Sequence, residues 1–200
     1  MELAAVIVQA GGTGARLGGA SKPDVVVGGR RLLDIFFAEL TGVGFSGRAV
    51  VVAPEGVAVP AGAIRTLEDP PHGGPLAGIA AGLEQLSGLP NDAVVGLGTC
   101  DAPLAPRLYP QLLARLAPVG AGQAEESDPP SGVAPAADPG WLQYLHGVYR
   151  LGALRALPLE RDKSIRSAFA GLDVMASADP LNWCIDVDTP QDAAALAARL

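Results

Sequence analysis

The chain has 200 residues, 49% of them hydrophobic, with a formal net charge of −7 and a pI near 4.7. This length and apolar content suffice for one buried core, so we expect a single domain over residues 1–200. The acidic balance argues against a nucleic-acid partner or an anionic membrane surface, because both need clustered Lys and Arg.

The cysteines and the N-terminal segment indicate the cellular compartment in which the protein is expected. Cys100 and Cys184 are too few and too far apart for a disulfide framework or a Cys-rich zinc site, so we expect reduced thiols. The first apolar run has no basic segment before it and is too short to span a membrane. We therefore expect a cytoplasmic protein without membrane association, present as a monomer or a weak homo-oligomer.

Short continuous apolar runs recur along the chain and are typical of strands buried on both faces. They cover residues 3–8, 49–53, 93–98, 145–149, 172–175 and 183–187. Helical patterns lie between them: an apolar stripe over 32–40, a helix opened by Pro75, and a third over 106–116. Thr189 predicts the N-cap of a last helix that runs to the C-terminus. The alternation predicts an α/β protein, a Rossmann-like three-layer α/β/α sandwich around a mostly parallel, mixed sheet.

The segment 119–140 interrupts this alternation. It is rich in Pro, Gly, Ala and acidic residues and has no helical or strand period. We expect a flexible excursion here, and composition favours disorder about as much as a substrate lid.

The segment 9–23, QAGGTGARLGGASKP, follows the first predicted strand and combines five glycines with one Arg and one Lys. Amides around Gly11, Gly12 and Gly14 can approach a nucleotide closely, while Arg16 and Lys22 can neutralise its phosphates. The spacing fits neither a P-loop nor a dinucleotide fingerprint. The segment therefore indicates a different phosphate-binding fold.

Carboxylates follow two later apolar runs. Asp101 ends a buried strand, where ligands gather in open α/β sheets, and can ligate Mg²⁺ together with phosphates. Near the C-terminus, Asp186 and Asp188 are separated by two positions and should share one face of a strand. Because Asp188 can serve the start of the last helix, Asp186 is the better second metal ligand.

The segment EDPPHGGPLAG places a glycine turn before a predicted helix N-terminus. Asp69 can bind a sugar hydroxyl or a base edge, and the backbone around Gly74, Pro75 and Leu76 can shape a base pocket. An ordinary helix-entry loop would look similar. His72 and His146 have no partners at metal-ligand spacing, so we expect solvent or core roles for them.

In order along the chain, the motifs GGTGARLGGASKP, GGPLAG, TCDAPL and DVDTPQD resemble the nucleotidyltransferase superfamily of glycosyltransferase-A-like fold. They are most similar to the molybdenum cofactor guanylyltransferases, and the resemblance spans nearly the whole chain. It implies GTP and Mg²⁺ along the opening loop, with Gln9, Ala10, Gly11 and Gly12 near the nucleotide and Lys22 on its phosphates. Asp69 would be a nucleotide contact and Asp101 the metal ligand.

The chain departs from the family pattern at four places. Gln9 stands where the family has Leu. Ala53 or Pro54 stands where the family has an Asn whose side chain can form a hydrogen bond to the base. Asp186 and Asp188 replace an Asn pair, which could alter metal affinity. The segment 119–140 lacks the basic residues expected where an anionic pterin would dock.

The resemblance implies transfer of GMP from GTP to the terminal phosphate of molybdopterin, with release of pyrophosphate. Arg16 and Lys22 would stabilise the developing pyrophosphate, and Asp101 would hold Mg²⁺. Two alternatives remain open: a nucleotidyltransferase acting on a sugar 1-phosphate or other small phosphorylated acceptor, and a nucleotide-binding relative without turnover.

Overall fold

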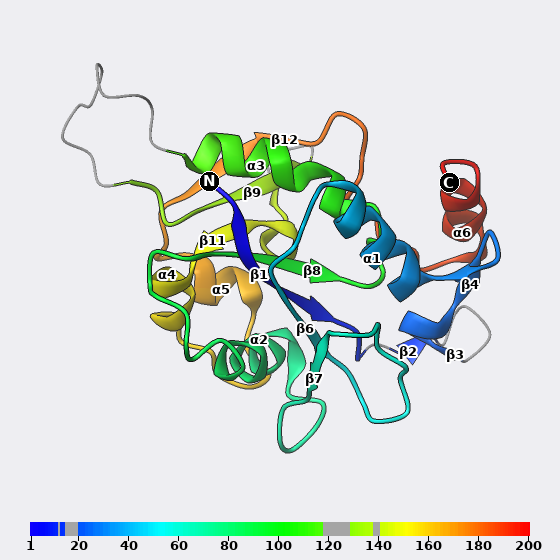
Figure 1. The fold of residues 1–200 in the computed structure, drawn as a ribbon, viewed down its shortest axis with the longest axis horizontal. Coiled ribbons are helices and arrows are strands. Elements are labelled where there is room, and N and C mark those ends of the chain that lie inside the picture. Colours follow the sequence, from blue (N-terminus) through cyan, green and yellow to red (C-terminus); the bar gives the residue numbers. More distant parts are fainter. Residues whose placement is uncertain (12, 15–19, 118–128, 138–140) are drawn as a thin grey trace.

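In the computed structural model an eight-stranded mixed sheet runs through the protein (Figure 1), and the described residues are 1–11, 13–14, 20–117, 129–137 and 141–200. Its strand order is β10-β9-β11-β8-β1-β6-β7, with β12 pairing β9 on its other side. The strands are β1 (Leu3–Gln9), β6 (Arg48–Val52), β7 (Ile64–Thr66), β8 (Val94–Thr99), β9 (Gly132–Ala137), β10 (Trp141–Leu142), β11 (Val148–Arg150) and β12 (Val174–Ala178).

The centre of the sheet is parallel. Strand β1 pairs in parallel with both β6 and β8, and β6 pairs in parallel with β7. Strand β11 then runs antiparallel to β8 and β9. The carboxyl ends of β8, β1, β6 and β7 therefore lie side by side along one edge of the molecule.

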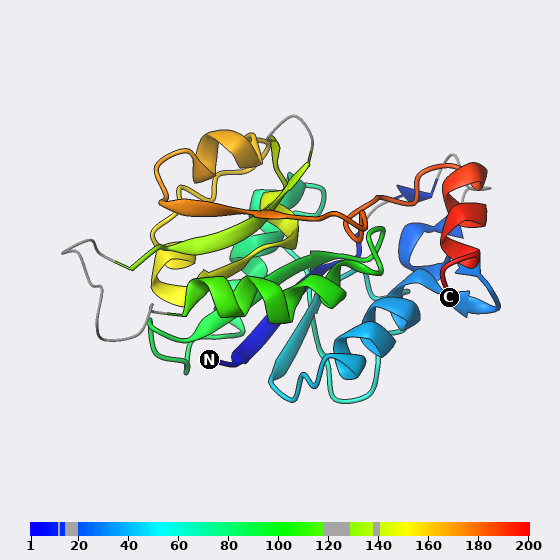
Figure 2. The same ribbon diagram turned by 90° about the horizontal axis from the view of Figure 1, so that it is seen from above.

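Helices cover both faces of the sheet, as Figures 1 and 2 show. The helices are α1 (Leu32–Gly42), α2 (Gly74–Glu84), α3 (Tyr109–Leu116), α4 (Leu151–Arg155), α5 (Ile165–Phe169) and α6 (Pro190–Ala197). One core cluster joins α1 and α3 to Val6 and Val8 of β1, and another joins α2, α4 and α5 to Ala5 and Ile7. Alternate residues of β1 thus face opposite helix layers, which confirms the predicted three-layer α/β/α sandwich.

The C-terminal helix packs outside the main sheet. Leu196 of α6 lies in a small cluster with Val27 of β4 (Val26–Val27) and Ile35 of α1. Strand β4 pairs with β5 (Arg30–Arg31), and Figure 1 shows α6 beside this hairpin. The predicted cap is confirmed, because Thr189 and Asp192 form a capping box. The helix ends at Ala197, before the predicted C-terminal end.

The prediction of a strand over 183–187 is wrong. The carboxylate of Asp179 accepts hydrogen bonds from the backbone N–H groups of Trp183 and Cys184, at 2.9 and 3.0 Å. These amides are bound in a turn and do not form a strand ladder. The turn also removes the strand face that Asp186 and Asp188 were expected to share.

The prediction of a flexible excursion over 119–140 is wrong for residues 132–137, which form the buried strand β9. Strand β9 pairs with β10, β11 and β12. Gly132 packs against the ring of Tyr149, where a Cβ would lie 2.2 Å from the ring. In the sequence alone, a small residue such as Gly132, which makes room for this ring, cannot be told from the glycines of a flexible linker. Residues 118–128 and 138–140 lie outside the described part of the chain.

Strand β7 and the helices α4 and α5 were not predicted. Each is short, three or five residues, so periodicity has too few positions to detect it. Within the described residues, no helix is both long and apolar enough to cross a bilayer.

Candidate active site

A cavity of about 560 Å³ opens at the carboxyl ends of the four parallel strands. Its walls come from the residues that follow or end β1, β6, β7 and β8, together with the N-terminus of α2. Three inter-strand spacings of roughly 4.8 Å give this row of strand ends a width of about 14 Å.

The polar end of the cavity is organised by Lys22. Its Nζ lies 2.6 Å from Oδ2 of Asp101 and 2.5 Å from Oδ1 of Asp188. Lys22 begins a short 3₁₀ turn (Lys22–Asp24), entered from a small hairpin of β2 (Thr13–Gly14) and β3 (Ala20–Ser21). Three segments remote in sequence thus meet at one ammonium group.

The backbone holds the C-terminal carboxylates near Asp101. The N–H of Val187 donates to the carbonyl of Asp101 at 2.8 Å. The carboxylate of Asp192 accepts from the N–H groups of Asp188 and Thr189, at 3.2 and 2.8 Å. Because Asp192 satisfies the helix start, the side chain of Asp188 is available to Lys22.

The charges at this end stabilise one another. Burial opposes ionisation of Lys22 and of Asp101, but their mutual hydrogen bond and charge outweigh it. The pKa of Lys22 is therefore raised and that of Asp101 is lowered. The structure thus holds an ammonium and a carboxylate, both charged near neutral pH, at the end of β8.

The donor set fits Mg²⁺ in its usual protein environment. Oδ1 of Asp101 is buried and has no hydrogen-bond partner among the described residues, while Oδ2 contacts Lys22. Partial burial, followed by the charge of Asp101, raises the pKa of Asp186 to about 6. No group of three or more His, Cys, Asp or Glu side chains at metal spacing occurs in the described ranges. One or two carboxylates completed by substrate phosphates suit Mg²⁺.

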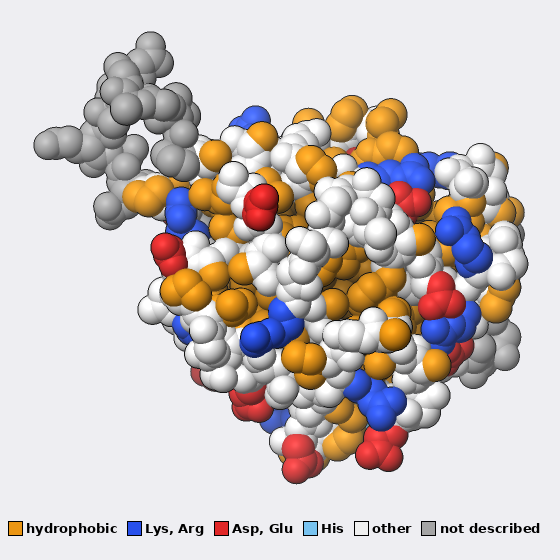
Figure 3. Space-filling view, viewed as in Figure 1, with side chains coloured by type: hydrophobic (Ala, Val, Ile, Leu, Met, Phe, Trp, Pro, Cys, Tyr) orange, Lys and Arg blue, Asp and Glu red, His pale blue; other side chains and the backbone are white. Residues whose placement is uncertain are grey.

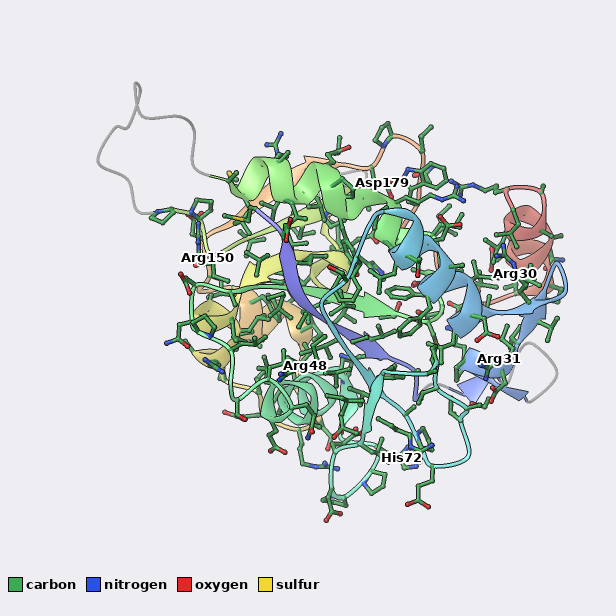
Figure 4. All side chains as sticks on the ribbon, viewed as in Figure 1. Arg30, Arg31, Arg48, His72, Arg150 and Asp179 are labelled. Carbon is green, nitrogen blue, oxygen red and sulfur yellow. The ribbon has the colours of Figure 1, made fainter. Side chains whose placement is uncertain are left out.

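The far end of the cavity has mostly apolar walls, among them Val52, Pro54 and Leu67. Glu68 adds a carboxylate there, and its Oε1 accepts from the N–H of Gly73 at 3.3 Å. His72 also lines the cavity and lies near the end of β7 in Figure 4. Apolar walls with few polar groups are typical of a pocket for a flat ring.

Gln9 and the loop before α2 are tied together. Nε2 of Gln9 donates to the carbonyl of Pro75 at 2.9 Å, which joins the end of β1 to the first turn of α2. Arg161 donates to the carbonyls of Pro70 and Pro71, at 2.6 and 3.3 Å. These bonds hold the loop that forms one side of the cavity.

The predicted site residues fall into three groups. Those that line the cavity are Gln9, Gly11, Lys22, Gly74, Pro75 and Asp101. Those that do not line it are Ala10 and Leu76, both fully buried in the core, the exposed Asp69, and Asp186, which lines a neighbouring cavity. Gly12 and Arg16 lie outside the described residues.

Sequence reasoning gave no site role to Glu68 and assigned Asp188 to the helix start. Glu68 lines the cavity where its neighbour Asp69 does not. The capping pattern of Thr189 and Asp192 was a usable signal, because a carboxylate at Asp192 already satisfies the first amides of the helix. For His146 a solvent or a core role was expected, and its side chain is buried.

The parallel strand ends, the cavity along them and the lysine between carboxylates together define an α/β protein of the open-sheet class with a candidate ligand site at the strand ends. The model of the MobA-like NTP transferase domain matches residues 6–178. The chain therefore belongs to the MobA-like family of nucleotidyltransferases.

Among curated proteins, the chain is similar to a molybdenum cofactor guanylyltransferase of Acidiphilium cryptum (strain JF-5). The two are 36% identical over 116 residues, which is 55% of this chain and 55% of that relative. The match thus spans little more than half of the relative's length.

Solved structures share the fold. Molybdopterin-guanine dinucleotide biosynthesis protein A from Archaeoglobus fulgidus has a TM-score of 0.63 at 20% identity, over 98% of this chain and 100% of that one. The 2-C-methyl-D-erythritol 4-phosphate cytidylyltransferase from Thermus thermophilus has a TM-score of 0.62 at 21% identity, over 100% and 98%. These likenesses agree with the predicted fold class.

Proposed function

We propose that this chain transfers GMP from GTP to the terminal phosphate of molybdopterin and releases pyrophosphate, with Mg²⁺ as cofactor. The observation that carries the proposal is Lys22, held between Asp101 and Asp188 at the strand ends. The similarity to the molybdenum cofactor guanylyltransferase of Acidiphilium cryptum supports guanylyl transfer to the molybdenum cofactor.

The cavity supports one orientation of the donor. The triphosphate belongs at the Lys22 and Asp101 end, where the cation and the glycine-rich hairpin lie. The base belongs at the Pro54, Leu67 and Glu68 end, across the row of strands. Guanine offers adjacent N–H donors, and the carboxylate of Glu68 can accept from them.

The reaction needs little covalent chemistry from the protein. An oxygen of the acceptor phosphate forms a bond to the α-phosphorus of GTP. The bond from that phosphorus to the oxygen bridging the β-phosphorus breaks, and pyrophosphate leaves with the electron pair. No protein base is needed, because a phosphate monoester is already largely ionised near neutral pH.

The protein contributes position and charge. Lys22, with its raised pKa, stays protonated and would neutralise the departing pyrophosphate. Asp101, with Asp186 as the second candidate, would hold Mg²⁺, which supplies charge withdrawal from the phosphates. In the proposal, Arg16 of the segment 9–23 neutralises the same pyrophosphate.

The donor is tested by thermal melting with GTP, CTP, ATP and UTP, each with Mg²⁺. A ligand that binds only the native state raises its stability, so GTP should raise the melting temperature most. Stabilisation by CTP without stabilisation by GTP would overturn the guanylyl assignment. A Lys22→Ala variant should lose the shift, and Lys163→Ala, which alters the chain's other lysine at an exposed position, should keep it.

A further inference from the structure

The stretch 179–189, between β12 and α6, brings the C-terminal carboxylates to the candidate site. Figure 2 shows it, in orange to red, running from β12 towards α6. The match to the family model ends before this stretch. Asp188 contacts Lys22, and Asp186 lines a second cavity of about 440 Å³ that shares Leu145 with the first. The shape of this stretch therefore decides where both carboxylates lie.

Asp186 lies between two anchored backbone amides. Before it, the N–H of Cys184 donates to the carboxylate of Asp179 at 3.0 Å. After it, the N–H of Val187 donates to the carbonyl of Asp101 at 2.8 Å. The chain between these two anchors is very short, so the direction in which the Asp186 carboxylate points depends on both of them.

The turn that forms the first anchor needs support from outside. Asn182 has a φ of 51°, in the left-handed region that non-glycine residues occupy only when their surroundings hold them there. The guanidinium of Arg199, just beyond the end of α6, donates to the carbonyls of Leu181 and Asn182 at 2.6 and 3.0 Å. Such charge-assisted bonds are stronger than neutral ones. The C-terminal end of the chain thus holds the turn in its shape.

The ring of Trp183 joins this turn to the body of the protein. The guanidinium groups of Arg199 and Arg107 lie 4.5 and 4.6 Å from its ring centroid. Arg107, in the 3₁₀ turn Ala105–Leu108, is itself fixed by a two-pronged pair with Glu39 of α1 at 2.6 and 2.7 Å. Arg199 pairs with no carboxylate in the described part of the chain, so its contacts are this ring and the two carbonyls. Its role therefore lies in the geometry of the turn.

We propose that Arg199 is a positioning residue for Asp186. By holding Trp183 and the turn before it, Arg199 fixes the first of the two anchors and keeps the Asp186 carboxylate in place for the metal ion. This inference rests on the proposed function, in which Asp186 is the second candidate ligand of Mg²⁺, and extends that site to the C-terminal end of the chain.

The test uses a GTP analogue with a methylene group between its α- and β-phosphorus atoms, which cannot be cleaved there. Calorimetric titration gives its Kd with Mg²⁺ and with EDTA, and the ratio of the two Kd values is the gain due to the metal. Arg199→Gln should reduce this gain about tenfold, as is typical when a group that orients a metal ligand is lost. Its Kd with EDTA should stay as in wild type, whereas a merely structural defect would weaken binding in both conditions.

Variants of the stacked ring and of a remote arginine sharpen the test. Trp183→Leu removes the ring and should also reduce the Mg²⁺ gain, while Trp183→Phe keeps a flat ring and should retain most of it. The matched control is Arg115→Gln, which makes the same charge change at an exposed position of α3 and should leave the gain unchanged.

A double-mutant cycle shows whether Arg199 acts through Asp186. In an Asp186→Asn background, Arg199→Gln should change the Mg²⁺ gain by less than about twofold, because effects that share one partner do not add. Full additivity of the two losses, or an unchanged gain in Arg199→Gln alone, would overturn the inference.

The inference and the proposed function fail in different measurements. If Mg²⁺ does not strengthen binding of the analogue to wild-type protein, the proposed metal site is refuted. A normal gain in wild type that Arg199→Gln leaves unchanged refutes only the positioning role of Arg199.

Discussion

The two neighbouring cavities are built in different ways. The first takes its residues from the ends of adjacent parallel strands, and most follow an apolar run directly in the sequence. The second takes Trp141, Arg166 and Asp186 from three segments separated by turns and short helices. On the space-filled face in Figure 3, basic and acidic side chains are interspersed and do not form one broad basic area. The charged side chains on this face are therefore not gathered into one patch. The first cavity is encoded by motifs, while the second depends on tertiary packing.

Asp101→Asn, in the first cavity, should have the largest effect on turnover. It removes the carboxylate that contacts Lys22 and supplies the buried Oδ1, so turnover should fall by about 10³-fold or more, in line with losing metal stabilisation. Steady-state pyrophosphate release measures this loss, with the exposed Asp92→Asn as control. Retention of more than a tenth of the turnover would contradict the assigned role.

Lys22→Ala should have the next largest effect. It removes the cation that would stabilise the departing pyrophosphate, and such groups are typically worth about 10²–10³-fold in kcat. The comparison is with Lys163→Ala in the same pyrophosphate assay. Similar losses in both lysine variants would show that general charge matters and the position of Lys22 does not.

His146 lines the second cavity and should make stability depend on pH. Burial lowers the pKa of His146 to about 4, although the charges of Asp101 and Asp179 oppose the shift. The unfolded chain takes up this proton near pH 6.5, before the folded protein does. The free energy of unfolding should therefore fall as pH drops from about 6.5 towards 4, by about 2–3 kcal/mol from this group.

Urea denaturation at pH 5 and pH 7.5 measures this dependence. His146→Gln should remove this fall, because glutamine does not titrate, so acidification from pH 7.5 to pH 5 should destabilise the variant less than wild type. The raised pKa of Asp186 acts in the opposite direction in the same window and is present in both proteins. Equal pH dependence in the two proteins would show that His146 is not buried in its neutral form.

Asp188→Asn should have the smallest effect. Its side chain is 48% exposed, and exposed ion pairs contribute about 0.2–1 kcal/mol. The asparagine can still accept from Lys22, so the KM for GTP should change by no more than about fivefold. A loss as large as that of Asp101→Asn would mean that Asp188 is itself a metal ligand.

Local signals in the sequence were sufficient for much of the fold. The apolar runs of β1, β6 and β8, the stripe of α1 and the cap of α6 each depend on neighbouring residues. Strand β9 could not be predicted, because Gly132 within it is explained only by the ring of Tyr149 from another strand.

The candidate site was also predictable only in part. Lys22 and Asp101 follow apolar runs or glycine turns, and the structure joins them. The position of Asp188 depends on a hydrogen bond from Val187 to the carbonyl of Asp101, which joins segments far apart in the chain. The stacking of Arg166 on Trp141 likewise has no local pattern in the sequence.

The central claim is tested most directly by pyrophosphate release from GTP and Mg²⁺, with purified molybdopterin or glucose 1-phosphate as acceptor. The account predicts release that requires molybdopterin, is abolished by Asp101→Asn and is not supported by glucose 1-phosphate. Release with glucose 1-phosphate alone, or no release with either acceptor from protein that GTP stabilises, would contradict it.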